Sequence, residues 1–257
     1  MFDLSGRVAL VTGCGSPRGI GFAVARALAE HEARVAITAT SERVLDRESE
    51  LRERGAETWS ARADLTDPHA AAALVDQVLE RFGRIDVLVN NAGMAQSGSP
   101  TAEAPFVDLG PERWARAIDR TLTTAVNVTR AALPGMLERG HGRVIFVSSV
   151  TGPVVSMPGD AAYSAAKAGM DGLMRALALE AGPAGVTVNS VAPGWIDTAS
   201  STPAELEAGR QTPVGRPGTP DEVAAAIVFL AAPGSSYVNG HSLVVDGGNT
   251  IQEAKGS

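Results

Sequence analysis

Two scarce polar residues, Tyr163 and Lys167, stand four positions apart in the segment AAYSAAKAG at residues 161–169. The chain of 257 residues contains only two tyrosines and two lysines, and chance gives this spacing roughly once or twice in a hundred such sequences. The surrounding Ala, Leu and Met favour a helix, in which positions i and i+4 share one face. A phenol and an ammonium that converge on one point are suited to proton transfer. The alternative is a surface tyrosine stacked on an aliphatic lysine stem.

A second segment whose residues could form a functional site is the glycine-rich stretch VALVTGCGSPRGIGFAVARAL at residues 8–28. Its glycines fall between an expected strand and an expected helix, where they permit a tight turn and a close approach of the backbone to a pyrophosphate. The phosphates would then rest on the positive end of the helix. The spacing of Gly13, Gly15, Gly19 and Gly21 meets the general dinucleotide fingerprint only loosely.

The end of the second expected strand bears on the choice of coenzyme. An NAD site usually has an acid here for the ribose 2′-hydroxyl, whereas an NADP site needs room and a cation for the 2′-phosphate. The strand ends in Ala39, Thr40 and Ser41, and Arg18 of the glycine loop supplies a cation. We therefore expect NADP(H) to be preferred over NAD(H). The alternative is that Glu42 folds back to the ribose and NAD is preferred.

Composition limits the class of protein. A net charge of −7 with scattered arginines argues against nucleic acid or an anionic membrane as the main partner. The single cysteine, Cys14, rules out an internal disulfide framework and suits a reducing cytoplasm. No signal peptide or membrane span is expected. No metal site is expected either.

The elements that must position these residues alternate along the chain. Apolar strand-like runs are separated by Ala-, Leu- and Glu-rich helical runs, which predicts an α/β fold with a doubly wound parallel sheet of about seven strands and helices on both faces. One domain, residues 1–257, is expected. Two irregular segments, 93–113 and 198–220, are expected to form pocket walls, the second as a substrate lid. Strands are predicted at 7–12, 34–38, 57–65, 85–90, 143–149, 186–193 and 242–247, and helices at 19–31, 42–54, 68–82, 111–138, 161–181 and 221–232.

Seven motifs occur in the order that one protein family shows. They are TG and GIG within 12–21, ADLTD at 63–67, NNAG at 90–93, SS at 148–149, YSAAK at 163–167, VNSVAPGWIDT at 188–198 and VDGG at 245–248. Together they make the chain resemble the short-chain dehydrogenase/reductase family over essentially its whole length, in particular its 3-oxoacyl reductase-like members. The resemblance implies a Rossmann-type fold and identifies YSAAK as the active-site helix.

The resemblance also implies catalytic roles. Tyr163 is implied as the acid that protonates the carbonyl oxygen, and Lys167 as the group that lowers its pKa and holds the nicotinamide ribose. Ser149 is implied as the hydrogen-bond donor to the substrate oxygen, although Ser148 also fits from the residues alone. At the position where the family has an asparagine that holds a water, this chain has Thr121. We expect a weaker proton relay there, because Asn127 lies on another helix face.

The coenzyme site implied by the same resemblance runs along the whole crevice. Asp64 and Leu65 are implied at the adenine, and the glycine loop is two residues longer than usual, which leaves Arg18 next to Gly19. The full set of coenzyme residues expected is Gly13, Arg18, Gly19, Ile20, Gly21, Thr40, Ser41, Asp64, Leu65, Asn91, Ala92, Gly93, Tyr163, Lys167, Pro193, Gly194, Ile196 and Thr198.

The function expected is NADP-dependent interconversion of a ketone and a secondary alcohol, with a small-molecule substrate. A rival is 3-oxoacyl-[acyl-carrier-protein] reductase, which Gly140 and Leu179 disfavour because arginines for an acidic carrier are expected at those places. A rival from another class is a non-catalytic dinucleotide-binding sensor or scaffold. The resemblance implies a homotetramer or homodimer built from the helices at 111–138 and 161–181.

Overall fold

A single parallel sheet of seven strands forms the centre of the molecule. In the computed structural model, which describes residues 2–93 and 104–253, all six strand pairings are parallel and the strand order is β3-β2-β1-β4-β5-β6-β7. The doubly wound fold expected from the sequence is therefore confirmed. The strands are β1 (Val8–Thr12), β2 (Arg34–Ala39), β3 (Thr58–Arg62), β4 (Val87–Asn90), β5 (Gly142–Val147), β6 (Val186–Pro193) and β7 (Ser242–Val245).

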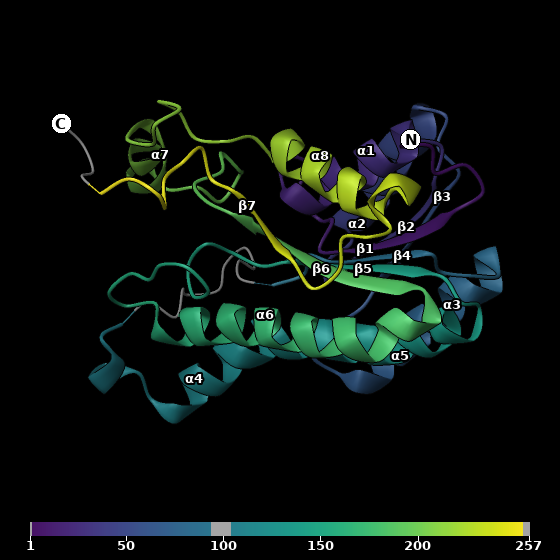
Figure 1. The fold of residues 1–257 in the computed structure, drawn as a ribbon, viewed down its shortest axis with the longest axis horizontal. Coiled ribbons are helices and arrows are strands. Elements are labelled where there is room, and N and C mark those ends of the chain that lie inside the picture. The colour runs from purple at the N-terminus through teal and green to yellow at the C-terminus, as the bar shows by residue number, and fades with distance from the viewer. Residues whose placement is uncertain (1, 94–103, 254–257) are drawn as a thin grey trace.

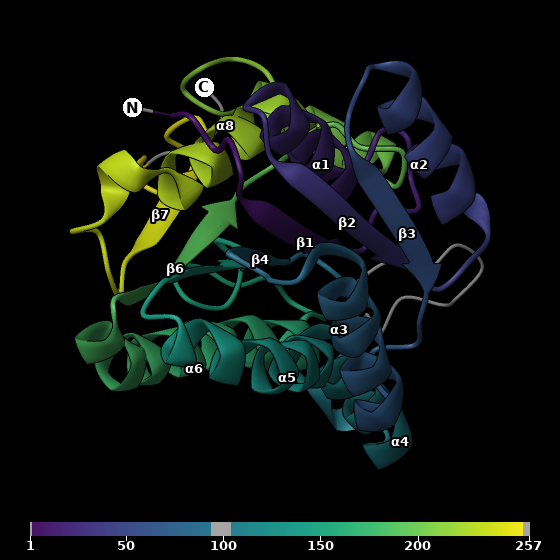
Figure 2. The same cartoon turned by 90° about the vertical axis from the view of Figure 1, so that its right-hand side faces the viewer.

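Helices cover both faces of this sheet (Figures 1 and 2). One face carries α1 (Ile20–Glu30), α2 (Arg43–Glu53) and α8 (Pro220–Ala231), and the opposite face carries α3 (Pro68–Phe82), α5 (Thr124–Glu138) and α6 (Ala161–Ala181). The shorter α4 (Pro111–Ile118) precedes α5, and α7 (Pro203–Arg210) stands apart from the sheet at one end of the molecule (Figure 1). Short 3₁₀ segments lie at Phe106–Asp108, Gly182–Ala184 and Pro233–Ser235.

Burial on both faces explains the sequence of the central strands. Every residue of β1, β4, β5 and β6 is buried, which accounts for the mostly apolar composition of these strands on both faces. Their side chains divide between two cores. One lies under α1 and α8 and includes Val11, Leu28 and Ile227, and the other lies under α3, α5 and α6 and includes Leu88 and Met170.

Two predicted elements differ in the structure. The predicted helix 111–138 is interrupted by a π-helical segment, η2 (Asp119–Thr123), between α4 and α5. The predicted irregular segment 198–220 contains α7, which begins with a capping box in which Thr202 and Glu205 satisfy each other's backbone amides. The sequence T-P-A-E carried this signal, since Thr with Glu three residues later and Pro in the first turn marks a helix start.

No helix within the described residues is long and apolar enough to cross a membrane.

Candidate active site

The carboxyl ends of β1 and β4, which are neighbours in the sheet, are tied together by Asn91. Its side-chain amide donates to the carbonyls of Thr12 (2.8 Å) and Gly13 (3.2 Å). The Thr12 hydroxyl in turn accepts from the backbone amides of Asn91 (3.0 Å) and Ala92 (2.9 Å). The NNAG motif therefore fixes the start of the glycine loop at the point where the strand order reverses, which is where α/β sheets bind nucleotides.

Close packing explains why this loop needs glycine. A Cβ on Gly13 would lie 2.7 Å from Asn91 Nδ2, and one on Gly21 would lie 2.4 Å from the same atom and 2.6 Å from the Gly13 carbonyl. Gly19 is the N-cap of α1 and makes no side-chain cap, and the first turn holds no acid. The amide groups of this helix start are thus available to a phosphate. Cys14 is buried and burial raises its pKa, as suits a packing residue.

Arginines that the sequence analysis did not single out lie at the carboxyl ends of β2 and β3. Arg43 Nε donates to Ser41 Oγ (3.3 Å), next to the exposed Thr40. Arg62 is ion-paired with Glu42 (2.9 Å), so Glu42 has a partner other than a ribose. The pairing of β2 with β3 identifies Arg62 as a neighbour of this site, because the last residue of β2 pairs with Arg62 in the sheet.

Arg18 pairs across the molecule rather than with this group. Its Nη2 lies 2.8 Å from Asp197 Oδ1, and both side chains are well exposed. The pair joins the glycine loop to the loop that follows β6. At the predicted adenine end, Leu65 is buried and Asp64 accepts from the amide and hydroxyl of Thr66.

The loops after β5 and β6 carry the next expected residues. The amide of Val150 donates to the Pro193 carbonyl (3.0 Å), which joins the two loops. Gly194 packs closely, since a Cβ there would lie 2.7 Å from the Cβ of Asp246. Ile196 forms a bridge with Gly218, and the hydroxyl of Thr198 contacts those of Ser200 and Ser201 in its own loop.

The catalytic residues expected from the sequence meet at the start of α6. Ser149 contacts the Tyr163 side chain through a hydrogen bond, and its hydroxyl also accepts from the amide of Thr151 (3.0 Å). Ser148 is instead directed toward the carbonyl of Lys167 (3.5 Å). Lys167 Nζ lies 5.7 Å from the centre of the Tyr163 ring and donates to the carbonyl of Val147 (2.6 Å).

The electrostatics of Tyr163 differ from the expected lowering of its pKa. Burial raises the pKa of Tyr163 to about 12, and the carboxylates of Asp160 and Glu205 act in the same direction. Hydrogen bonding with Ser149 opposes this rise. The Tyr163 phenol by itself therefore holds its proton strongly, since the loss of hydration outweighs the effect of its hydrogen bond.

Burial acts on Lys167 as well, and lowers its pKa to about 8. Asp171, a buried acid on the next turn of α6, raises this pKa in part. Asp171, Asp160 and Glu205 were not predicted from the sequence, although Asp171 stands four residues after Lys167 and thus shares its helix face.

Thr121 lies where the long helix is locally unwound. It is buried within η2, and its backbone is close to Gly93, whose added Cβ would lie 3.6 Å from Thr121 Cα. Segments of π-helix often accompany functional sites. Asn127 is directed elsewhere, because its amide donates to the carbonyls of Leu65 (3.0 Å) and Thr66 (3.2 Å).

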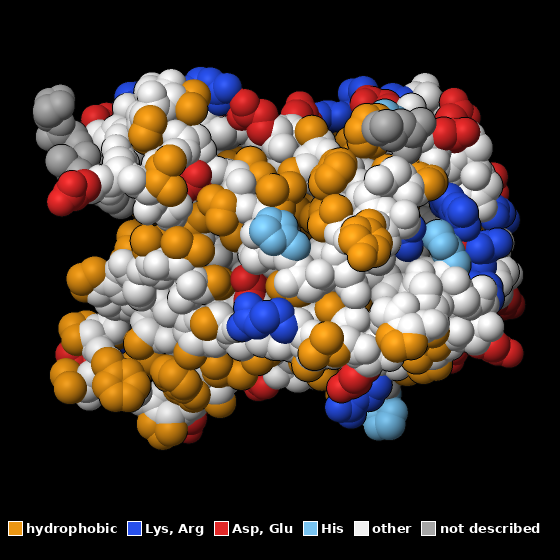
Figure 3. Space-filling view, viewed as in Figure 1, with side chains coloured by type: hydrophobic (Ala, Val, Ile, Leu, Met, Phe, Trp, Pro, Cys, Tyr) orange, Lys and Arg blue, Asp and Glu red, His pale blue; other side chains and the backbone are white. Residues whose placement is uncertain are grey.

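Exposed apolar side chains gather at the end of the molecule that carries α4, at the lower left of Figure 3. Phe106 and Val107 are exposed there, and Val154 and Met157 are exposed on the loop between Ser149 and Tyr163. Part of the predicted segment 93–113, residues 94–103, falls outside the described residues.

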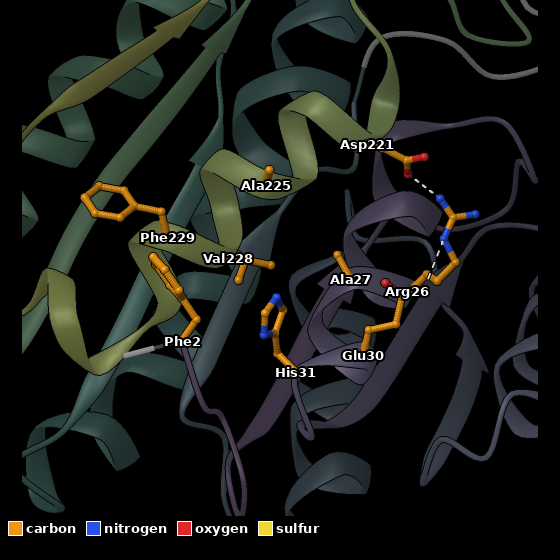
Figure 4. Close-up of a pocket in the computed structure, with 9 residues that line it drawn as sticks. All are labelled: Phe2, Arg26, Ala27, Glu30, His31, Asp221, Ala225, Val228 and Phe229. Carbon is orange, nitrogen blue, oxygen red and sulfur yellow. Dashed lines mark hydrogen bonds and ion pairs between the residues drawn. The ribbon is translucent and has the colours of Figure 1, made fainter.

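A cavity of about 650 Å³ lies away from these residues. It is found between α1 and α8, where Phe2, His31 and Phe229 approach one another and Arg26 pairs with Asp221 (Figure 4). It includes no predicted site residue. Within residues 2–93 and 104–253, no group of three His, Cys, Asp or Glu side chains is arranged to hold a metal ion.

Comparisons with known proteins bear on the family and the fold of the chain. Residues 13–250 match the family model described as Enoyl-(Acyl carrier protein) reductase. The chain is 42% identical to cis-4-hydroxycyclohexanecarboxylate dehydrogenase of Sinomonas cyclohexanicum, over 95% of this chain and 96% of that protein. It is 39% identical to the 3-oxoacyl-[acyl-carrier-protein] reductase FabG of Vibrio cholerae, over 96% and 98%. A crystal structure of a putative gluconate dehydrogenase from Agrobacterium tumefaciens matches with a TM-score of 0.89 and 34% identity, over 98% of each chain.

Proposed function

Since the chain belongs to the short-chain dehydrogenase/reductase family and is an oxidoreductase of alcohols and carbonyl compounds, we propose that it interconverts a ketone and a secondary alcohol with NADP(H). The observation that carries the proposal is the convergence of Ser149, Tyr163 and Lys167, with Ser149 following β5 at the same carboxyl edge of the sheet at which the glycine loop follows β1. When bound, the nicotinamide coenzyme supplies or accepts the hydride.

The residues of the chain supply the proton and the orientation. Ser149 holds the substrate oxygen, and Tyr163 donates its phenolic proton to that oxygen during reduction. Lys167 supplies a positive charge that favours the phenolate once the proton has left. Because burial and two carboxylates raise the pKa of Tyr163 to about 12, reduction starts from a fully protonated phenol at neutral pH.

The coenzyme preference rests on cations at the ends of β2 and β3. Arg43 at the start of α2 and Arg62 at the end of β3 lie next to the segment Thr40–Ser41, which supports a site for the 2′-phosphate. Arg18 of the glycine loop, which is paired with Asp197, is proposed as a third cation of this site. The partners of these arginines, Ser41, Glu42 and Asp197, would exchange for phosphate oxygens. The glycine loop and the uncapped start of α1 fit the pyrophosphate.

The substrate proposed is a small uncharged carbonyl compound. Exposed apolar residues before α4 and on the loop between Ser149 and Tyr163 support it, and Asp160 and Glu205 place negative charge near Tyr163. The similarity to FabG favours a second candidate, 3-oxoacyl-[acyl-carrier-protein] reductase. Negative charge near the site opposes docking of an acidic carrier.

The proposal extends to assembly and location. Apolar residues line a groove of about 250 Å³ between α5 and α6, among them Leu133, Leu173 and Leu177, and this supports a homotetramer or homodimer through these helices. The single buried cysteine supports a cytoplasmic location.

The test is consumption of NADPH, beside NADH, with ketones, aldehydes, free 3-oxoacyl thioesters and carrier-bound thioesters. Tyr163→Phe is the blank. Turnover with NADPH that this variant loses supports the proposal, and faster turnover of carrier-bound thioesters would favour the second candidate. Tight coenzyme binding without any turnover would instead favour a sensor or scaffold.

A further inference from the structure

A buried acid, Asp171, lies one helical turn beyond Lys167 and has no part in the chemistry above. Only 2% of Asp171 and 5% of Lys167 is exposed. Residues four apart share one face of a helix, so both side chains lie on the face of α6 that packs on the sheet. A carboxylate is rarely buried without a group that offsets its lost hydration.

The contacts of the two side chains fall on neighbouring positions of the sheet. Lys167 Nζ donates to the Val147 carbonyl on β5 (2.6 Å), and Asp171 Oδ1 accepts from Ser190 Oγ on β6 (2.9 Å). Val147 pairs with Val191, the residue next to Ser190. The ammonium and the carboxylate therefore approach the same part of the sheet from one helix.

Few other charges are placed to act on this lysine. Strands β4 and β6 contain no ionisable side chain, and Arg143 of β5 stands at the opposite end of its strand. The segments α4 and η2, which both pack against α6, carry Glu112, Arg113 and Arg116 and Asp119 and Arg120, respectively. Asp171 is the charged residue that raises the pKa of Lys167 against the effect of burial.

We propose that Asp171 is a positioning residue whose carboxylate keeps Lys167 protonated beside Tyr163, with Ser190 holding that carboxylate in place. Its consequence for catalysis rests on the function proposed above. The electrostatic pairing does not, because it can be measured without coenzyme or substrate. The rival explanation is an acid that serves only to fix α6 to β6 through Ser190.

The composition of the chain makes a direct test possible. With only two lysines, Lys167 and Lys255, protein labelled with ¹³C at the lysine Cε gives two signals, and Lys255 serves as the internal reference. In Asp171→Asn, which can still accept a hydrogen bond from Ser190, we expect the affinity of Lys167 for its proton to fall by about tenfold, or one pH unit. An unchanged midpoint in the folded variant would overturn the proposal.

Ser190→Ala is the matched control, because it removes the hydrogen bond and keeps the charge. We expect it to shift the Lys167 midpoint by less than about threefold. A shift as large as that of Asp171→Asn would instead support the purely structural explanation. If Asp171→Asn does not fold, the wild-type chain decides: the carboxyl carbon of Asp171 must shift at the Lys167 midpoint, and its failure to do so refutes the pairing.

Kinetics then tests the catalytic consequence. With the best carbonyl substrate, the fall of kcat/KM at alkaline pH should move to lower pH in Asp171→Asn by the amount found for Lys167. A profile that does not move contradicts the role in catalysis. If no carbonyl is reduced even by the wild-type protein, the proposed function fails, and the NMR titration still decides the pairing.

Discussion

Replacement of Gly21 by alanine tests whether the contact between the glycine loop and the NNAG turn is rigid. Gly21 lies in the first turn of α1, and helix propensity alone predicts that alanine stabilises this position by up to about 1 kcal/mol. The structure predicts the opposite sign. The new methyl group would lie 2.4 Å from Asn91 Nδ2 and 2.6 Å from the Gly13 carbonyl oxygen, well inside contact distance.

The expected size follows from these two effects. Overpacking of this kind costs about 1–3 kcal/mol, and displacement of the Asn91 amide weakens hydrogen bonds worth about 1 kcal/mol. After the gain in propensity, we expect Gly21→Ala to lower the free energy of unfolding by about 2 kcal/mol, which corresponds to a fall in Tm of roughly 5 °C for a chain of this size. Coenzyme affinity should fall at least about tenfold, because a 1.4 kcal/mol loss suffices.

Gly172→Ala is the control, measured by urea denaturation and by quenching of tryptophan fluorescence with NADPH. Gly172 lies within α6 and is exposed, and a Cβ there meets no atom within 4 Å. This variant should gain stability by up to about 1 kcal/mol and bind coenzyme normally. Size-exclusion chromatography should show that both variants keep the assembly state of the wild type. If Gly21→Ala is also stabilised and binds NADPH as tightly as the wild type, the reasoning from close contact is refuted.

Three further outcomes are expected. Burial lowers the pKa of His141 from 6.5 to about 4, so the unfolded chain takes up the proton first and stability should fall as the pH decreases through this range; urea titrations of His141→Gln should show a flatter dependence. Asp197→Asn releases Arg18 from an exposed ion pair and should tighten NADPH binding by about two- to fivefold, as measured by calorimetry, whereas weaker binding would contradict the role of that arginine. Glu205→Gln removes a negative charge near Tyr163. It should raise kcat/KM severalfold for ketones that carry a carboxylate, relative to the methyl esters of the same ketones. An unchanged ratio of the two kcat/KM values would show that this charge does not act on the substrate.

The strands and most helices could be predicted because they depend on local pattern. A continuous apolar run that ends before a glycine marks β1, a β-branched stretch between two glycines marks β6, and the predicted span 186–193 is the one observed. The predicted helix 161–181 also has the observed limits. These elements can be assigned without knowledge of distant residues, because their own composition indicates that they are buried.

The interruption at η2 could not be predicted in this way. Residues 111–138 form one helical pattern in the sequence, and the π-helical turn falls where the Thr121 backbone lies near Gly93 of a different loop. Likewise, the raised pKa of Tyr163 depends on burial and on Glu205, which is distant in the chain and is brought near by α7. Neither the π-helical turn nor the raised pKa of Tyr163 can be predicted from the spacing of residues within a motif.

Some contacts of the site residues could be predicted from the sequence, and others could not. The structure brings Tyr163 and Lys167 together near one end of α6, as their spacing implied, and Ser149 contacts Tyr163, as the family resemblance implied. The ion pairs of Arg18 with Asp197 and of Arg62 with Glu42 join segments far apart in the chain. Such pairs depend on the tertiary arrangement of loops and strands, which a linear pattern does not encode.

The order of strands across the sheet has a consequence for biosynthesis. The first four strands occupy neighbouring positions, β3-β2-β1-β4, so they can pair on the ribosome before Ser149 is translated. The helix that packs on α1, α8, is made only after β6 and contributes Val223, Ile227 and Leu230 to the core beneath it. During synthesis an apolar surface over α1 thus stays uncovered until α8 emerges, and in this interval the nascent chain is exposed to aggregation and suited to chaperone binding.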